Sequence, residues 1–183
     1  MPQSVRAKTA FWIKNKQNLA LLKWAAETRI ETKEQPGRAG TDYNEKEKCA
    51  MIRIYAAENY EEMSEKAARI IAAQVIVKPE CVLGLATGSS PVGTYQRLVE
   101  RYKAGKLSFA GVTTVNLDEY KGLSGAHDQS YRYFMRHNLF DHIDVRPECT
   151  HVPNGLAEDA EAECARYDAF VRSLGCADLQ LLG

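Results

Sequence analysis

Two short polar segments follow apolar stretches and could carry chemistry. The first, Thr87-Gly-Ser-Ser90, lies between the apolar run Leu83-Gly-Leu-Ala86 and Pro91, a residue suited to the first turn of a helix. Free backbone N–H groups at a helix start, a glycine that lets a ligand approach and three hydroxyl groups favour a phosphate-binding loop. The segment has neither the Gly-Lys-Ser/Thr ending of a Walker loop nor a G-x-G-x-x-G pattern. An ordinary strand-to-helix turn with Ser90 as the N-cap is the alternative interpretation.

The second segment is Asn116-Leu-Asp-Glu-Tyr120, in which two acidic residues follow a β-branched stretch. An aspartate with an ordinary pKa of about 3.9 is ionised at neutral pH. Asp118 could therefore act as a general base if it faced a substrate carbon. A solvated acidic turn is the alternative for this segment alone. Taken together, the two segments indicate a site for a phosphorylated small molecule with a proton-abstracting carboxylate.

The elements that must position these residues alternate between strands and helices. Strands are expected at 52–56, 81–86, 112–117, 150–153 and 178–182, and helices at 60–77, from 91 onward, at 129–140 and at 157–174. This alternation predicts an α/β fold with three layers, a Rossmann-like and mostly parallel sheet with helices on both faces. Ligands bind beyond the carboxyl ends of the strands in such sheets. Both polar segments are therefore expected at the same sheet edge.

The first fifty residues differ in composition from the rest. A lysine-rich amphipathic stretch at 11–30 predicts a helix, and 31–48 combine Pro36, Gly37 and Gly40 with many charged residues, as linkers do. We expect residues 1–50 to be an atypical, disordered extension or to precede the true start at Met51. Residues 51–183 are then expected to form the α/β domain.

The overall composition excludes several classes of function. The chain has 183 residues, and its 24 basic and 24 acidic side chains give no net charge, which disfavours nucleic-acid binding. No apolar run approaches the roughly 20 residues that cross a membrane. The five cysteines form no C-x-x-C pair, so a disulfide framework is disfavoured and a cytoplasmic location is expected. The spacing of the histidines and cysteines indicates no metal site.

Three colinear motifs resemble the glucosamine-6-phosphate deaminase family. They are Leu83-Gly-Leu-Ala-Thr-Gly-Ser-Ser-Pro-Val-Gly-Thr-Tyr95, Asn116-Leu-Asp-Glu-Tyr-Lys-Gly-Leu123 and His127-Asp-Gln-Ser-Tyr131. The resemblance implies phosphate binding by Thr87, Gly88, Ser89 and Ser90. It also implies that Asp118 moves a proton between C2 and C1 of the ring-opened amino sugar. Supporting roles fall to Glu119 and Tyr120, which flank this base, and to Tyr131, which would line the pocket.

The resemblance further implies a reaction and its partners. Members of this family convert glucosamine 6-phosphate to fructose 6-phosphate and ammonia, with no metal or organic cofactor. The expected partner is a small amino-sugar phosphate, with no nucleic acid and no membrane. The family includes monomers and hexamers, so a homo-oligomer of the full-length parent protein stays open. Two alternatives are a 6-phosphogluconolactonase-like hydrolase, whose acidic motif more often ends in Asp-Glu-Arg, and a non-catalytic sugar-phosphate sensor.

The resemblance covers only the N-terminal part of the family's domain. The later segments, which supply the histidine and acids for ring opening and basic residues for the phosphate, do not occur in the sequence. A sheet truncated at a central strand exposes an apolar edge. We therefore expect the chain alone to be inactive, poorly soluble or both.

Overall fold

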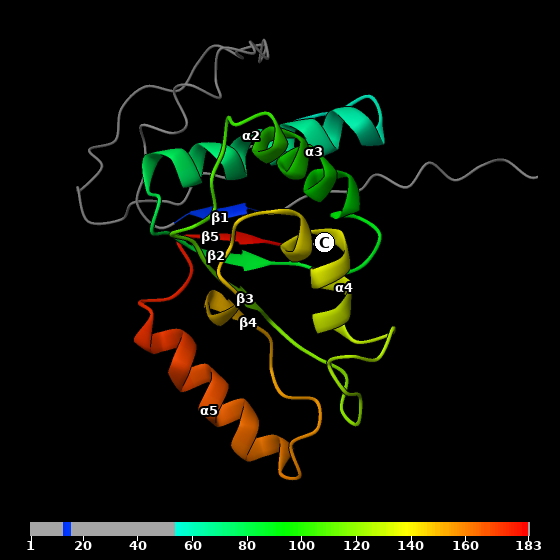
Figure 1. Cartoon of the computed structure of the whole chain (residues 1–183), viewed down its shortest axis with the longest axis vertical. Coiled ribbons are helices and arrows are strands. Elements are labelled where there is room, and N and C mark those ends of the chain that lie inside the picture. Colours follow the sequence, from blue (N-terminus) through cyan, green and yellow to red (C-terminus); the bar gives the residue numbers. More distant parts are fainter. Residues whose placement is uncertain (1–12, 16–53, 183) are drawn as a thin grey trace, which may run out of the picture.

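One five-stranded sheet organises the protein. The computed structural model describes residues 13–15 and 54–182. The strands are β1 (Ile13–Asn15), β2 (Val82–Leu85), β3 (Thr113–Asn116), β4 (Thr150–His151) and β5 (Leu179–Leu181), in the spatial order β1-β5-β2-β3-β4. β2 pairs in parallel with β3 and with β5, β3 pairs in parallel with β4, and β1 runs antiparallel to β5. The predicted mostly parallel α/β sheet is confirmed (Figure 1).

Helices cover both faces of this sheet. They are α2 (Tyr60–Val77), α3 (Val92–Lys103), α4 (Tyr131–Asn138) and α5 (Ala160–Ser173), with short 3-10 turns at Phe140–His142 and Pro147–Cys149. One hydrophobic core joins α2, α3 and α4 to the strands, and its members include Ile71, Leu83, Tyr95, Leu98, Met135 and Leu181. In Figure 1, α5 lies on the other side of the sheet from α2 and α3. Among the helices of residues 54–182, none is long and apolar enough to cross a membrane.

The helix α2 begins and ends where the sequence predicts. Its N-cap is Asn59, whose side-chain oxygen accepts a hydrogen bond from the backbone N–H of Glu62 at 2.8 Å. Ala68, Ile71 and Val75 are buried because steps of three and four residues place them on one face of the helix. Local signals are therefore sufficient to define this element.

Two predictions for the N-terminal region are wrong within the described residues. Ile13–Asn15 form a strand rather than part of the helix expected at 11–30, because they pair with the open edge of β5. The strand expected at 52–56 is absent from 54–57, where Ile54 is 82% exposed. β1 occupies the β5 edge of the sheet, and residues 54–57 pair with none of the five strands. The remainder of both predicted elements lies outside the described residues.

Side-chain caps set the starts of the last two helices. The Ser130 hydroxyl accepts from the N–H of Tyr133 at 3.0 Å, so α4 begins at Tyr131 rather than at 129. The Asp159 carboxylate caps α5 in the same way, so this helix begins at Ala160 rather than at 157. Both residue types are favoured N-caps because their oxygens satisfy free amides of the first turn.

The helix α5 contacts the sheet mainly through aromatic side chains. Tyr167 is buried, and its hydroxyl donates to the carbonyl oxygens of Asn116 (2.9 Å) and His151 (3.0 Å). The ring centroids of Phe170 and His151 lie 4.4 Å apart. Cys164 is exposed, since α5 meets the sheet through these two aromatic side chains further along the helix.

Candidate functional site

A pocket of about 260 Å³ lies at the carboxyl ends of the parallel strands. The last residues of β2 and β3, the residues that follow them, the end of β5 and the first residue of α4 form its walls. They are Leu85, Ala86, Thr87, Asn116, Leu117, Asp118, Tyr131, Leu181 and Leu182. The structure thus brings Thr87 and Asp118 together, because adjacent parallel strands end at the same edge of the sheet.

The end of β2 is fixed by the buried hydroxyl of Tyr95. This hydroxyl accepts from the backbone N–H of Ala86 at 3.1 Å and donates to the carbonyl oxygen of the same residue. Burial raises the pKa of Tyr95, so the phenol stays neutral and able to donate. One side chain of α3 therefore holds both backbone groups of the residue that precedes Thr87.

The loop of residues 87–90, hereafter the 87–90 loop, presents unbonded amides. Gly88 has a φ of +97°, a conformation that favours glycine. The backbone N–H groups of Gly88, Ser89 and Ser90 donate no hydrogen bond within the described part of the chain. Pro91, without a side-chain bond, is the N-cap of α3, so the alternative with Ser90 as N-cap is wrong. The loop can therefore offer donors to an anion.

The amide of Gly93 in the first turn of α3 is not available to a ligand. It donates to the hydroxyl of Tyr60 at 2.8 Å. The prediction of free amides at this helix start therefore holds for the 87–90 loop but not for Gly93.

At the end of β3, Asn116 joins the two strands that flank the pocket. Its side-chain N–H donates to the carbonyl oxygen of Leu85 at 3.1 Å. Its buried side-chain oxygen has no hydrogen-bond partner among residues 54–182. Asp118, two residues on, is exposed and takes part in no hydrogen bond or ion pair in the same range. Its carboxylate is therefore free to face a ligand in the pocket.

Glu119 does not line this pocket but anchors its loop to α4. One carboxylate oxygen accepts from the N–H groups of Tyr120 (2.9 Å) and Tyr131 (2.8 Å), and the other accepts from Arg132 (3.1 Å). A negative charge at the first turn of a helix also interacts favourably with the helix dipole. Glu119 therefore links the segment that carries Asp118 to the helix that carries Tyr131.

Tyr120 and Tyr131 form an aromatic pair beside Asp118. Their ring centroids lie 4.8 Å apart, and only Tyr131 reaches the pocket wall. Interaction with the Tyr120 hydroxyl raises the pKa of Tyr131, and desolvation and the negative charge of Asp118 act in the same direction. Tyr131 is therefore neutral at physiological pH and can donate a hydrogen bond.

Three residues that position the site are not recognisable in the sequence as having that role. Tyr95 has the spacing of a core residue and Asn116 that of a strand end. Tyr60 appears only as the first residue of a helix. A polar group at the tip of a core aromatic, next to a glycine-bearing loop, is the one local signal that points to Tyr95. In residues 54–182, no group of three or more His, Cys, Asp or Glu side chains could hold a metal ion.

Comparison with known proteins identifies relatives of this chain, although no family model matches it. Glucosamine-6-phosphate deaminases of Lachnoclostridium phytofermentans and Clostridium perfringens are each 57% identical to it over 132 residues, which is 72% of the chain. These matches cover 56% and 54% of the two relatives. The solved structure of a monomeric glucosamine-6-phosphate deaminase of the NagB superfamily is 50% identical, with a TM-score of 0.65. The match covers 66% of this chain and 50% of the chain in the solved structure. The resemblance to glucosamine-6-phosphate deaminase is confirmed.

The chain spans about half the length of the curated glucosamine-6-phosphate deaminases it matches. A 6-phosphogluconolactonase from Thermotoga maritima is also similar in structure, with a TM-score of 0.54 over 65% of this chain and 53% of its own. Its sequence identity is only 19%, so this likeness shows the fold alone. The deaminase resemblance is therefore the one that sequence and structure both support.

Proposed function

We propose that this chain supplies the phosphate loop and the general base of a glucosamine-6-phosphate deaminase. The 87–90 loop would bind the phosphate, and Asp118 would carry the proton. The observation that carries the proposal is that Thr87 and the unbonded Asp118 line one pocket. The identity to deaminase relatives supports the choice of substrate.

The chemistry follows from the ring-opened substrate. Asp118 removes the C2 proton, which gives an enol-amine, and returns this proton to C1. The imine left at C2 takes up water and releases ammonia, so that fructose 6-phosphate forms. The C1 carbonyl of the substrate accepts the electron pair left at C2, and the amine lone pair then forms the C2 imine as C1 takes up the proton, so no metal or organic cofactor is needed. Neutral Tyr131 lies at the pocket wall, where it could donate a hydrogen bond to a sugar oxygen.

The proposal extends to the metabolic role of the reaction and to the activity of the isolated chain. The reaction would serve amino-sugar breakdown in the cytoplasm. Because the chain spans about half of its relatives, we propose that it does not turn over substrate by itself. Normal ammonia release by the isolated chain would overturn that part of the proposal.

Two experiments test the assignment of the loop and the base. In the isolated chain, glucosamine 6-phosphate should shift the NMR amide signals of Gly88, Ser89 and Ser90. In a longer protein that carries this sequence and the family's remaining segments, Asp118→Asn should lower kcat for ammonia release by about 100-fold or more, the usual range for loss of a general base. KM should change little, and Asp128→Asn is the matched control. Near-normal turnover by Asp118→Asn would remove this residue from the mechanism.

The two alternative functions lack a comparable observation. The lactonase likeness is limited to the fold. A sugar-phosphate sensor does not require an unbonded carboxylate beside the phosphate loop.

A further inference from the structure

The hydroxyl of Tyr60 lies against the 87–90 loop. It donates to the carbonyl oxygen of Ser89 at 3.0 Å, with the carbonyl oxygen of Ser90 as a second acceptor at 3.2 Å. It also accepts from the backbone N–H of Gly93 at 2.8 Å. One phenol group thus bridges the loop and the first turn of α3.

The surrounding residues favour this contact. Tyr60 is the first residue of α2, and the Asn59 cap fixes the start of that helix. Gly93 allows the ring to approach, since a Cβ there would lie 2.8 Å from Tyr60 Cε1 and 2.4 Å from Ser64 Oγ. Any side chain at position 93 would therefore displace Tyr60 or separate the two helices.

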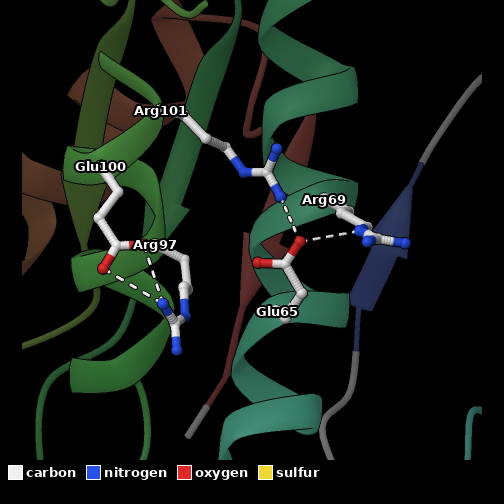
Figure 2. Close-up of polar contacts among 5 residues, drawn as sticks. All are labelled: Glu65, Arg69, Arg97, Glu100 and Arg101. Carbon is white, nitrogen blue, oxygen red and sulfur yellow. Dashed lines mark hydrogen bonds and ion pairs between the residues drawn. The ribbon is translucent and has the colours of Figure 1, made fainter. Parts of the chain in front are cut away.

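One ion pair further along joins α2 to α3, and two others lie within the helices (Figure 2). Glu65 of α2 pairs with Arg101 of α3 and, within its own helix, with Arg69 at 2.9 Å. In α3, Arg97 pairs with Glu100 at 2.9 Å. The Glu65–Arg101 pair crosses between the helices, so it supports the position from which Tyr60 reaches the loop.

The bond to Ser89 has a direct consequence for the loop. In a planar trans peptide, the C=O and the N–H of the next residue point in opposite directions. A Ser89 carbonyl held toward α2 therefore turns the N–H of Ser90 away from α2. That N–H donates to no group among residues 54–182, so it is available to a ligand. The amide of Gly93, by contrast, is occupied by Tyr60.

We infer that Tyr60 is a positioning residue for phosphate binding, which sets the orientation of the 87–90 loop and directs an anion to that loop rather than to Gly93. This inference rests on the proposed role of the loop in binding phosphate. In this role Tyr60 acts through the backbone of Ser89 and Ser90, whose carbonyl oxygens its hydroxyl contacts.

The test uses the isolated, ¹⁵N-labelled chain titrated with inorganic phosphate, so it requires no catalysis. Tyr60→Phe should weaken phosphate binding by about 5-fold or more, as expected for loss of one hydrogen bond that orients a donor. The Gly93 amide should exchange with solvent about 10-fold faster in this variant. Tyr133→Phe is the matched control, because Tyr133 is 39% exposed against 43% for Tyr60 and its hydroxyl makes no hydrogen bond in residues 54–182.

The possible outcomes separate the two ideas. Equal phosphate binding by Tyr60→Phe and the unaltered chain, with Gly93 exchange unchanged, overturns the inference and leaves the proposed function intact. If the unaltered chain shows no phosphate-dependent shifts at the loop, the proposed phosphate site fails, and the inference fails with it.

A second measurement on the unaltered chain covers the case in which Tyr60→Phe does not fold. The amide of Val92 donates no hydrogen bond in residues 54–182, whereas that of Gly93 donates to Tyr60. Gly93 should therefore exchange about 10-fold more slowly than Val92, after correction for sequence. Equal rates would show that the Tyr60 bond does not persist in solution and would overturn the inference.

Discussion

Glu119→Ala removes a carboxylate that accepts three backbone N–H groups, those of Tyr120, Tyr131 and Arg132. The bonds to the first turn of α4 resemble an N-cap, which contributes about 0.5–2 kcal/mol. The charge near the helix dipole adds about 0.3–1 kcal/mol. Because Ser130 also caps this helix, we expect the free energy of unfolding to fall by about 2 kcal/mol. Glu119→Gln keeps a neutral acceptor and should lose about half as much.

Urea unfolding of the chain, followed by circular dichroism, measures this difference through the midpoint and slope of the transition. Glu158→Ala is the control, because Glu158 is exposed and makes no hydrogen bond or ion pair in residues 54–182. Freed from the Glu119 anchor, the loop should also separate Tyr120 from Tyr131, and the pKa of Tyr131 should fall. A loss no larger than that of the control, together with an unchanged tyrosine titration, would refute the anchoring role of Glu119.

Two further predictions concern stability. Tyr95→Phe should destabilise the chain by about 2 kcal/mol, because both backbone groups of Ala86 lose their partner; an unchanged urea midpoint would contradict the bonds described. For Glu163, a hydrogen-bonded ion pair lowers the pKa to about 2. Because this value lies below the roughly 4.3 of an unfolded glutamate, its contribution to stability is complete above about pH 5 and disappears as the pH falls through about 2. Glu163→Gln should therefore lower the free energy of unfolding by about 1 kcal/mol or less at pH 7 and by almost nothing at pH 2. Thermal unfolding of both proteins across this pH range measures the difference. A stability difference that does not change with pH would contradict the role of the Glu163–Arg166 ion pair.

The parts of the fold that sequence reasoning predicted correctly are those with local signals. The bounds of α2 follow from the Asn59 cap and from apolar residues three and four positions apart. β2 and β3 are apolar or β-branched runs that end in polar loops, which also places Thr87 and Asp118 at one edge. In each case the residues that determine the element lie within the element or next to it.

The remaining features depend on contacts between distant segments. β1 forms because Ile13–Asn15 meet the edge of β5, and nothing within those three residues distinguishes a strand from a helix. The bond between Tyr60 and Gly93 spans 33 positions, and that between Asn116 and Leu85 spans 31. Side-chain groups that hold a loop through its backbone leave no periodic pattern, so only the folded chain reveals them.

The place of β5 in the sheet determines when the fold can close during synthesis. β5 lies between β1 and β2, yet it is the last of the five strands along the chain. Asp178, just before it, accepts from the N–H of Val82 at 2.9 Å, a contact between residues 96 positions apart. The ribosome releases β2, β3 and β4 first, so the β5 side of β2 has no partner until Leu181 emerges. Such long-range closure slows folding, and an unpaired inner edge is prone to join a neighbouring chain. The nascent protein is therefore most vulnerable to misassembly at β2, which is an interior strand once folding is complete.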